Sequence, residues 1–336
     1  MNPDAAAAVG RVPHGGSDDP DDVDFSANVN PEKPPGTADA YESAYDDIGR
    51  YPDDGYPAFR AAAADAVGCD PAQVVPTAGG LEAIRLAVET AVSAGDSVLV
   101  PAPGFGEYAR EVRLQGAEPT FVSPGAVLDA DPAPHALAVV CNPNNPTGHA
   151  YDDGDLRDFA ARCRAAGTTL LVDEAFLGFT ERPSLAGADG VVVARSLTKL
   201  YGTPGLRAGF AVATGDRLSR LESARRAWTL GAPAAAVGAY CLRQQAFVAE
   251  TCERVERERE RLRAALNERF DVRPSAAPFL LVDVGERDVG ALVAALRERG
   301  VAVRDATTFR GLDSHVRVAV RTPEENDLLA EAMLDV

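Results

Sequence analysis

Short apolar runs alternate with amphipathic stretches between about residues 56 and 213. The runs contain few polar positions, which is typical of strands buried on both faces of a parallel or mixed sheet. We expect such strands at Ser97–Val100, Ala136–Cys141, Thr169–Val172, Val191–Ala194 and Gly209–Ala213. The amphipathic stretches predict helices at 56–67, Gly80–Val92, Gly106–Leu114 and Asp155–Ala166. Buried strands alternating with helices indicate an α/β domain built on a large mixed sheet.

The pattern changes toward both ends of the chain. Residues 1–45 are rich in Pro, Gly and Asp and predict an irregular arm that precedes a large domain at 46–232. Residues 233–270 form a helical tract, heavily charged in its second half, that predicts one long helix connecting two domains. Residues 271–336 predict a smaller α+β domain, with strands at Phe279–Val284, Val301–Arg304 and His315–Val320 and helices at Val289–Arg299 and Thr322–Leu334.

Composition narrows the function classes. A formal net charge of −18 argues against nucleic-acid binding, which needs a basic face to neutralise phosphates. No run approaches the roughly twenty apolar residues of a membrane span. The N-terminus has no secretory signal pattern, and the cysteines (Cys69, Cys141, Cys163, Cys241 and Cys252) are scattered, so we expect a cytoplasmic protein without a disulfide framework or a metal site. An acidic, lysine-poor surface also suits a halophilic source.

Polar residues follow several of the expected strands directly. Asn142-Pro143-Asn144-Asn145 follows one strand, Asp173 the next, and Arg195-Ser196-Leu197-Thr198-Lys199 a third, with Arg207 shortly after. Ligands of open α/β sheets bind outside the carboxyl ends of the strands, so these side chains are expected to meet at one edge. The chain has only two lysines, and Lys33 stands in a proline-rich segment. Lys199 is therefore the expected amine nucleophile.

These residue types together suit pyridoxal 5'-phosphate (PLP), a phosphorylated pyridine aldehyde. A lysine forms an imine with the aldehyde and later moves protons. A carboxylate keeps the ring nitrogen protonated, which makes the ring an electron sink. Hydroxyls, an arginine and glycine amides at a helix N-terminus hold a phosphate, and Gly79-Gly80 directly precedes an expected helix.

The order and spacing of these motifs resemble the class I/II aminotransferase superfamily over nearly the whole chain. The resemblance implies a fold type I PLP-dependent transferase, a homodimer, and Lys199 as the residue that carries the cofactor. It implies that Asn145 faces the ring phenolate, that Asp173 faces the ring nitrogen and that Phe105 stacks on the ring. The implied phosphate ligands are Gly79, Gly80, Ser196, Thr198, Arg207 and, in the neighbouring subunit's site, Tyr51.

Phe176 departs from the pattern of many aminotransferases, which have Tyr there as a second donor to the phenolate. Ala78 also stands where relatives often have Asn, a change of little consequence because backbone amides bind the phosphate at that point. One hydrogen bond to the cofactor is therefore expected to be missing.

The arm is similar to that of threonine-phosphate decarboxylases of cobalamin biosynthesis. The matching motifs in the arm are His14-Gly15-Gly16 and Asp24-Phe25-Ser26-Ala27-Asn28-Val29-Asn30-Pro31. Further matches are Pro103-Gly104-Phe105-Gly106-Glu107-Tyr108, Asp173-Glu174-Ala175-Phe176 and Arg317-Val318-Ala319-Val320-Arg321-Thr322. The implied substrate is L-threonine O-3-phosphate, with Arg317 for the carboxylate and Arg304 for the phosphate. Arg321 and His14 are further phosphate candidates.

Two alternatives remain open from the sequence. One is a histidinol-phosphate or other amino-acid aminotransferase, which forms a keto product and depends on 2-oxoglutarate; Phe176 and Arg321 argue against the histidinol-phosphate enzymes, which usually have Tyr and Gly there. The other is a cofactor-binding regulatory domain. Regulators of this fold carry an added DNA-binding segment, and the first thirteen residues hold only one basic residue, Arg11.

Overall fold

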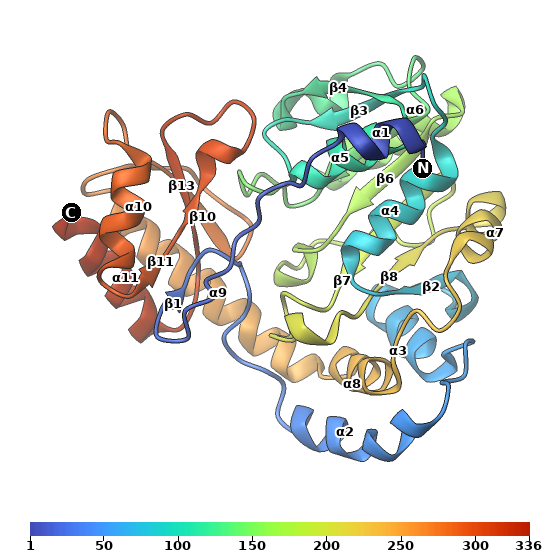
Figure 1. Cartoon of the computed structure of the whole chain (residues 1–336), viewed down its shortest axis with the longest axis horizontal. Coiled ribbons are helices and arrows are strands. Elements are labelled where there is room, and N and C mark those ends of the chain that lie inside the picture. Colours follow the sequence, from blue (N-terminus) through green and yellow to red (C-terminus); the bar gives the residue numbers. More distant parts are fainter.

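The computed structural model describes residues 1–336, with a seven-stranded sheet at the centre of the larger of two units (Figure 1). The helices are α1 (Pro3–Ala8), α2 (Thr37–Ser43), α3 (Pro57–Val67), α4 (Gly80–Ala91), α5 (Gly106–Leu114), α6 (Asp153–Ala166), α7 (Gly215–Ala224), α8 (Ala232–Leu242), α9 (Gln245–Leu266), α10 (Val289–Arg297) and α11 (Pro323–Asp335). The strands are β1 (Val23–Asp24), β2 (Val74–Thr77), β3 (Ser97–Pro101), β4 (Glu118–Val122), β5 (Leu137–Cys141), β6 (Thr169–Asp173), β7 (Val191–Ser196), β8 (Gly209–Val212), β9 (Asp271–Val272), β10 (Phe279–Asp283), β11 (Val301–Ala302), β12 (Arg304–Asp305) and β13 (His315–Ala319).

The large sheet is mixed and buried on both faces. Its strand order is β2-β8-β7-β6-β5-β3-β4; β8 runs antiparallel to β7 and β2, and the remaining neighbours are parallel. In β5, Leu137 and Val139 belong to the apolar cluster on one face, and Ala138 and Val140 belong to the cluster on the other. Alternate residues of a strand point to opposite faces, so a continuous apolar run fills both layers. The predicted α/β class with a large mixed sheet is confirmed.

The two edge strands of this sheet, β2 and β4, have no counterpart in the predicted set of strands. Each contains a proline, Pro76 in β2 and Pro119 in β4, and β4 is only partly buried. Proline donates no ladder hydrogen bond and is tolerated at a sheet edge, where one side of the strand needs no partner. The apolar runs of these strands are therefore short and interrupted.

The smaller unit is a four-stranded sheet with helices packed against it. Its strand order is β12-β13-β10-β9, with all neighbours antiparallel. A separate apolar cluster fills this unit and includes the fully buried Phe25 of the N-terminal segment. The predicted smaller α+β unit is confirmed, and the N-terminal segment is bound to it through a parallel pairing of β1 with β11, Val23 opposite Val301.

Two expectations about the ends of the large domain need correction. Residues 1–45 are not irregular throughout, because α1, β1 and α2 form within them. Residues 233–270 form two helices rather than one, since the backbone leaves the helical conformation at Gln244. The break separates the apolar α8, which packs against α2 and α3, from the charged α9, which crosses to α11 of the smaller unit (Figure 1). None of the helices has the length and apolar character needed to cross a membrane.

Candidate functional site

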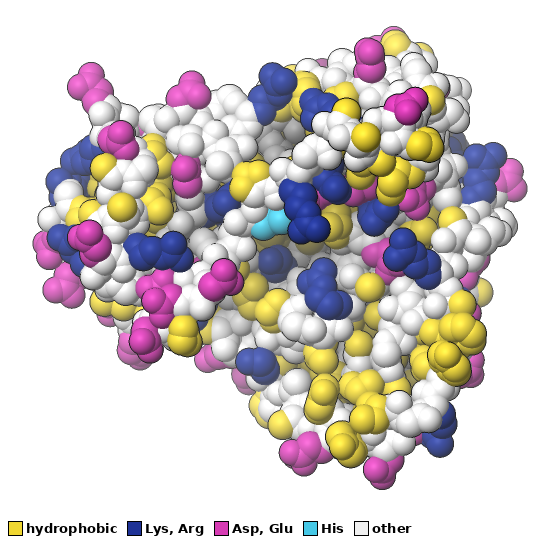
Figure 2. Space-filling view, viewed as in Figure 1, with side chains coloured by type: hydrophobic (Ala, Val, Ile, Leu, Met, Phe, Trp, Pro, Cys, Tyr) yellow, Lys and Arg dark blue, Asp and Glu magenta, His cyan; other side chains and the backbone are white.

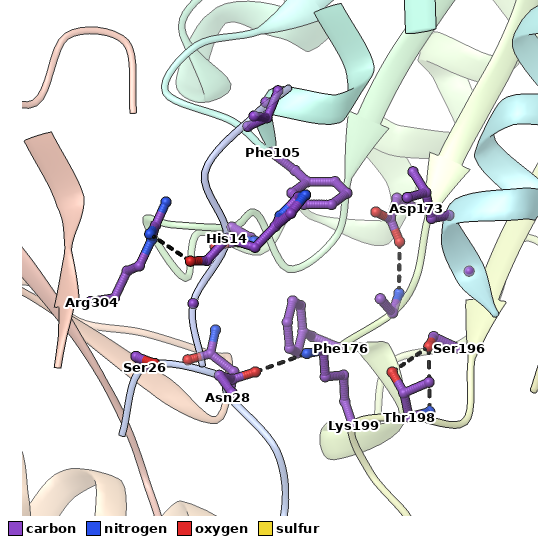
Figure 3. Close-up of a pocket in the computed structure, with 18 of the residues that line it drawn as sticks. His14, Ser26, Asn28, Phe105, Asp173, Phe176, Ser196, Thr198, Lys199 and Arg304 are labelled. Atoms are coloured by element: carbon purple, nitrogen blue, oxygen red, sulfur yellow. Dashed lines mark hydrogen bonds between the residues drawn. The ribbon is translucent and has the colours of Figure 1, made fainter. Parts of the chain in front are cut away.

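The carboxyl ends of the adjacent strands β5, β6 and β7 meet at a cavity of about 350 Å³. Figure 3 shows Asp173, Ser196 and Thr198 on one side of this cavity, His14 and Arg304 on the other, and Lys199 between them. The lining also includes Gly80, Phe105, Asn145, Arg207 and Arg317. The fold therefore brings together nearly all of the residues singled out in the sequence.

Glycines shape one end of the cavity, where α4 begins. A Cβ atom at Gly79 would lie 2.9 Å from Nη2 of Arg207, and one at Gly80 would lie 3.1 Å from Cβ of Ser196. Ser196 and Thr198 are hydrogen-bonded to each other through their hydroxyls at 2.8 Å. Hydroxyls, a guanidinium and the first amides of a helix are thus gathered at one point, the donor set that proteins use for phosphate.

Strand β8 packs closely against this glycine turn. A Cβ atom at Gly209 of β8 would lie 2.6 Å from the carbonyl carbon of Gly79, closer than real Cβ contacts come. Only glycine at residue 209 lets β8 pair with its neighbours while Gly79 takes its positive-φ conformation, φ +91°.

Lys199 reaches into the cavity just after β7. Its Nζ donates a 2.8 Å hydrogen bond to the carbonyl of Ala27. Burial, assisted by the positive charges of Arg317 and Arg207, lowers the pKa of Lys199 to about 8. The amine is therefore far closer to its nucleophilic form at neutral pH than an exposed lysine is.

Asp173 ends β6 and carries the carboxylate of the cavity. Its Oδ2 accepts a 2.5 Å hydrogen bond from the hydroxyl of Tyr108, and its Oδ1 accepts one of 3.0 Å from the backbone N–H of Ala175. Burial raises the pKa of Asp173. A buried carboxylate with only neutral donors is suited to a positively charged partner such as a protonated ring nitrogen.

Arg317 of β13 is the most deeply buried cation of the site. Its Nη1 donates to Oδ1 of Asn145 at 2.5 Å, its Nη2 donates to the carbonyl of Ser26 at 2.6 Å, and its Nε is buried without a partner. Burial, followed by the charge of Arg304, lowers the pKa of Arg317. An anion bound beside Arg317 would accept hydrogen bonds from the guanidinium and would compensate for the water contacts that burial removes.

His14 and Arg304 close the cavity on the side of the smaller unit (Figure 3). The imidazole Nε2 of His14 lies 2.9 Å from Oε1 of the buried Glu107, and the ring lies 5.8 Å from that of Phe105. Arg304 donates to the carbonyls of Pro13 and His14 at 2.8 and 3.0 Å. The N-terminal segment is therefore bound to both units as it crosses the cavity.

Two predicted site residues lie elsewhere. Arg321 donates to the carbonyl of Asp24 and to the carboxylate of Glu325, and it is not among the residues that line the cavity. Through these contacts the guanidinium of Arg321 connects the N-terminal segment to α11. The expectation that Arg321 lines the substrate pocket is therefore corrected. Tyr51 is 76% exposed, stacks on Trp228 at 4.5 Å between ring centroids, and does not reach the cavity of its own chain.

The sequence reasoning missed several residues that contact the predicted ones. Ala27 and Glu107 provide the acceptors for Lys199 and His14, and Tyr108 is the donor to Asp173. Asn28 lines the cavity with a left-handed backbone, φ +53°. All four residues stand inside motifs that carry the resemblance to the family. The motifs were therefore recognised, but they did not indicate what each of these residues contacts.

Comparisons with known proteins agree with this geometry. The family model described as aminotransferase class I and II matches residues 20–333. Histidinol-phosphate aminotransferase 1 of Archaeoglobus fulgidus is 31% identical over 94% of this chain and 99% of its own. A putative threonine-phosphate decarboxylase of Caldanaerobacter subterraneus subsp. tengcongensis is 30% identical over 91% of this chain and 88% of its own.

A solved structure supports the fold. The histidinol-phosphate aminotransferase of Sinorhizobium meliloti, in complex with pyridoxal-5'-phosphate, superposes with a TM-score of 0.82 at 23% identity, over 90% of this chain and 87% of that one. The predicted fold type I architecture is confirmed. The donor set also fits the same cofactor, because the glycine turn with Arg207 suits a phosphate and Asp173 suits a ring nitrogen.

The lowered pKa of Lys199 predicts how fast the cofactor-free protein captures PLP covalently at different pH. With a pKa of about 8, the amine fraction and the capture rate rise about tenfold between pH 7 and pH 9 and then level off. An ordinary lysine would give a rise of about a hundredfold over the same interval without levelling. Borohydride trapping followed by mass spectrometry measures the rate, and a log-linear rise continuing through pH 10 would contradict the assignment. A Lys33→Arg variant, which removes the other lysine, should capture PLP at the same rate.

Proposed function

We propose that this chain, which belongs to the aminotransferase class I and II family, converts L-threonine O-3-phosphate to (R)-1-aminopropan-2-yl phosphate and CO2. PLP is the cofactor of this family and of this protein. The assignment makes the chain a lyase of cobalamin biosynthesis. We further propose a cytoplasmic location, since five free cysteines, three of them buried, suit a reducing compartment.

The observation that carries the proposal is the pairing of two separate cationic groups with Lys199 in one cavity. The two guanidiniums come from adjacent strands of the smaller unit, because Arg304 of β12 stands opposite Arg317 of β13, and Arg304 donates to the carbonyl of His14. L-Threonine O-3-phosphate carries a carboxylate and a phosphate at once, so it engages both groups. Histidinol phosphate has a phosphate and an alcohol but no carboxylate, so in an aminotransferase Arg317 would pair only with the carboxylate of the keto acid, whereas L-threonine O-3-phosphate engages both groups in one molecule.

Local charge makes this recognition possible in an acidic protein. Among the residues that line the cavity, Lys199, Arg207, Arg304 and Arg317 are basic and Asp173 alone is acidic. The net charge of −18 repels a phosphorylated substrate at long range, so binding depends on these short-range contacts. Figure 2 displays basic side chains gathered around the histidine at the centre of this face.

The proposed chemistry uses the chain's own groups in defined roles. When bound, PLP supplies an electron-accepting ring that takes up the electron pair of the bond being broken. Asp173, as a carboxylate, would keep the ring nitrogen protonated, and Asn145 would donate its amide N–H to the phenolate while its oxygen accepts from Arg317. Arg317 orients the carboxylate, the bond from Cα to the carboxylate carbon breaks, and CO2 leaves. Lys199 then returns a proton to Cα.

Phe176 supports a decarboxylase over many aminotransferases of the family. It lines the cavity with a ring that packs edge-on against Phe279, at 5.0 Å between centroids, and it has no hydroxyl to offer the phenolate. Asn145 is then the side-chain donor to that oxygen. The family pattern with Tyr at this position belongs to enzymes that transaminate.

A histidinol-phosphate or other amino-acid aminotransferase is the second candidate. It is favoured by the 31% identity to the Archaeoglobus protein, which matches the 30% identity to the putative decarboxylase. The same Lys199, Asp173 and Arg207 serve both reactions, so these residues do not separate them. The two candidates differ in product and in the need for a keto acid.

The proposed partner is a second copy of the chain. Tyr41, Tyr45, Ile48, Tyr51 and Trp228 are exposed large apolar side chains in the segment around α2 and next to it. Figure 2 displays hydrophobic side chains over the lower part of this face, where Figure 1 has α2 and α8. Contiguous exposed apolar surface is typical of an interface.

Light scattering of the holoenzyme should give twice the chain mass of 35.2 kDa, and a value of one chain mass would contradict the homodimer.

The decarboxylase predicts turnover without any keto acid. Purified holoenzyme in high salt, mixed with L-threonine O-3-phosphate, should release CO2 and aminopropanol phosphate in equal amounts, and Lys199→Ala should abolish both. The salt screens repulsion within the acidic surface. Absence of turnover, together with consumption of histidinol phosphate once 2-oxoglutarate is added, would establish the aminotransferase instead.

The role of His14 predicts a selective defect in substrate binding. His14→Ala removes the imidazole as a donor to the substrate phosphate, so KM for L-threonine O-3-phosphate should rise about tenfold with kcat changed less than twofold. PLP affinity should stay unchanged because His14 is outside the phosphate-binding turn. His149→Ala, at a histidine outside the cavity, is the matched control. A KM within twofold of the parent value would exclude His14 from phosphate recognition.

A further inference from the structure

Tyr108 lies behind the carboxylate that faces the cofactor ring. It occupies the first turn of α5, its side chain is fully buried, and it is not among the residues that line the cavity. Its hydroxyl donates to Oδ2 of Asp173 at 2.5 Å. Any effect of Tyr108 on the cofactor is therefore exerted through Asp173.

The proton of this hydrogen bond belongs to Tyr108. Burial, followed by the charge of Asp173, raises the pKa of Tyr108 well above its usual value, so the hydroxyl stays neutral. The neighbouring thiol of Cys141 donates to the carbonyl of Pro143 at 3.3 Å and is buried in its neutral form. Tyr108 thus has one strong acceptor, and its single proton points at Asp173.

No cation contacts Asp173 from the protein side. Its donors are the hydroxyl of Tyr108 and the N–H of Ala175, both neutral. The charged groups nearby are Glu174 and Arg195, which pair with each other at 3.2 Å. A neutral donor lowers the proton affinity of a carboxylate without cancelling its charge, and it leaves that charge for the ring nitrogen.

The same side chain also supports the ring that is expected to stack on the cofactor. The edge of Tyr108 meets Phe105 with centroids 5.5 Å apart and planes at 85°. Phe105 lines the cavity just before α5 begins. One buried residue therefore fixes both the carboxylate and the aromatic wall of the cofactor site.

We propose that Tyr108 is a positioning residue that sets the proton affinity of Asp173 and, through it, the protonation of the cofactor ring. The hydrogen bond from Tyr108 makes Asp173 a weaker base. The proton between Asp173 and the cofactor ring therefore stays on the ring nitrogen rather than on Asp173. A protonated ring withdraws electrons from the cofactor's linkage to Lys199, which lowers the pH at which that linkage titrates. The inference concerns the cofactor alone and is independent of whether the enzyme decarboxylates or transaminates.

Tyr108→Phe tests the inference, because it keeps the ring and the Phe105 contact and removes only the hydroxyl. In the holoenzyme, the pH midpoint of the visible absorbance change of bound PLP should move upward. The dissociation constant for PLP should rise about tenfold, as expected for loss of one hydrogen bond to a charged group. Neither readout involves turnover, so failure of the decarboxylase assay would not affect them.

Tyr151→Phe is the matched control. Tyr151 is also buried, and its hydroxyl has no hydrogen-bond partner. This variant should leave both the absorbance midpoint and the PLP affinity unchanged. A shift of equal size in both variants would assign the effect to loss of any buried hydroxyl and would overturn the proposal.

A second variant separates positioning from packing and covers the case in which Tyr108→Phe folds poorly. Site-specific 3-fluorotyrosine at position 108 keeps the shape and makes the hydroxyl a stronger donor. The absorbance midpoint should then move downward, opposite to Tyr108→Phe. An unmoved midpoint in the fluorinated protein, or movement in the same direction as Tyr108→Phe, would overturn the proposal.

Discussion

Main-chain carbonyl oxygens of one N-terminal segment, residues 13–27, accept hydrogen bonds from three of the four basic side chains around the cavity. Arg304 donates to the carbonyls of Pro13 and His14, Arg317 to Ser26 and Lys199 to Ala27. Buried positive charge is costly unless it is hydrogen-bonded, and Asp173 is the one carboxylate that lines the cavity. The segment must therefore cross between the two units, and the pairing of β1 with β11 sets its register.

The carbonyl dipoles compensate only part of the positive charge in the cavity. The uncompensated charge affects the reactivity of Lys199 and the binding of anions. The pKa of Lys199 falls to about 8, and Nε of Arg317 is buried without a partner. A cofactor phosphate supplies part of the missing negative charge, and the proposed substrate, with its carboxylate and phosphate, would supply the rest. Because the donors are held in place before the ligand arrives, little reorganisation is needed when the ligand binds. The remaining contacts act on the opposite wall, where Tyr108 and Ala175 hold the single carboxylate.

Much of the fold could be predicted because buried strands have a simple signature. β5, β6 and β7 are continuous apolar runs, and the residues after them, Asn145, Asp173 and Lys199, were expected at one edge for that reason. The edge strands β2 and β4 escaped prediction because a proline interrupts each of them and β4 is also partly exposed. The break at Gln244 was also missed, since helical composition continues through it and only the packing of α8 and α9 against different units separates them.

Site residues could be predicted where the chemistry requires one particular residue type. Residues whose role depends on which side chain they contact in the folded protein could not be predicted as well. Lys199 could be chosen because the only other lysine stands in a proline-rich segment. Arg321 was misplaced because it stands in the same motif as Arg317, but β13 ends at Ala319 and Arg321 lies beyond the strand, just before α11. Tyr108 and Glu107 act through other side chains, and sequence spacing alone carries no sign of which residue they contact.

The most direct test of the central claim is the mass of the product formed in D2O. If CO2 leaves and Lys199 returns a solvent-exchanged proton to Cα, aminopropanol phosphate made from L-threonine O-3-phosphate will carry one non-exchangeable deuteron at that carbon, next to the hydrogen kept from the substrate. A keto product that has lost both its nitrogen and the Cα hydrogen, with the carboxylate still attached, would contradict the account and identify an aminotransferase.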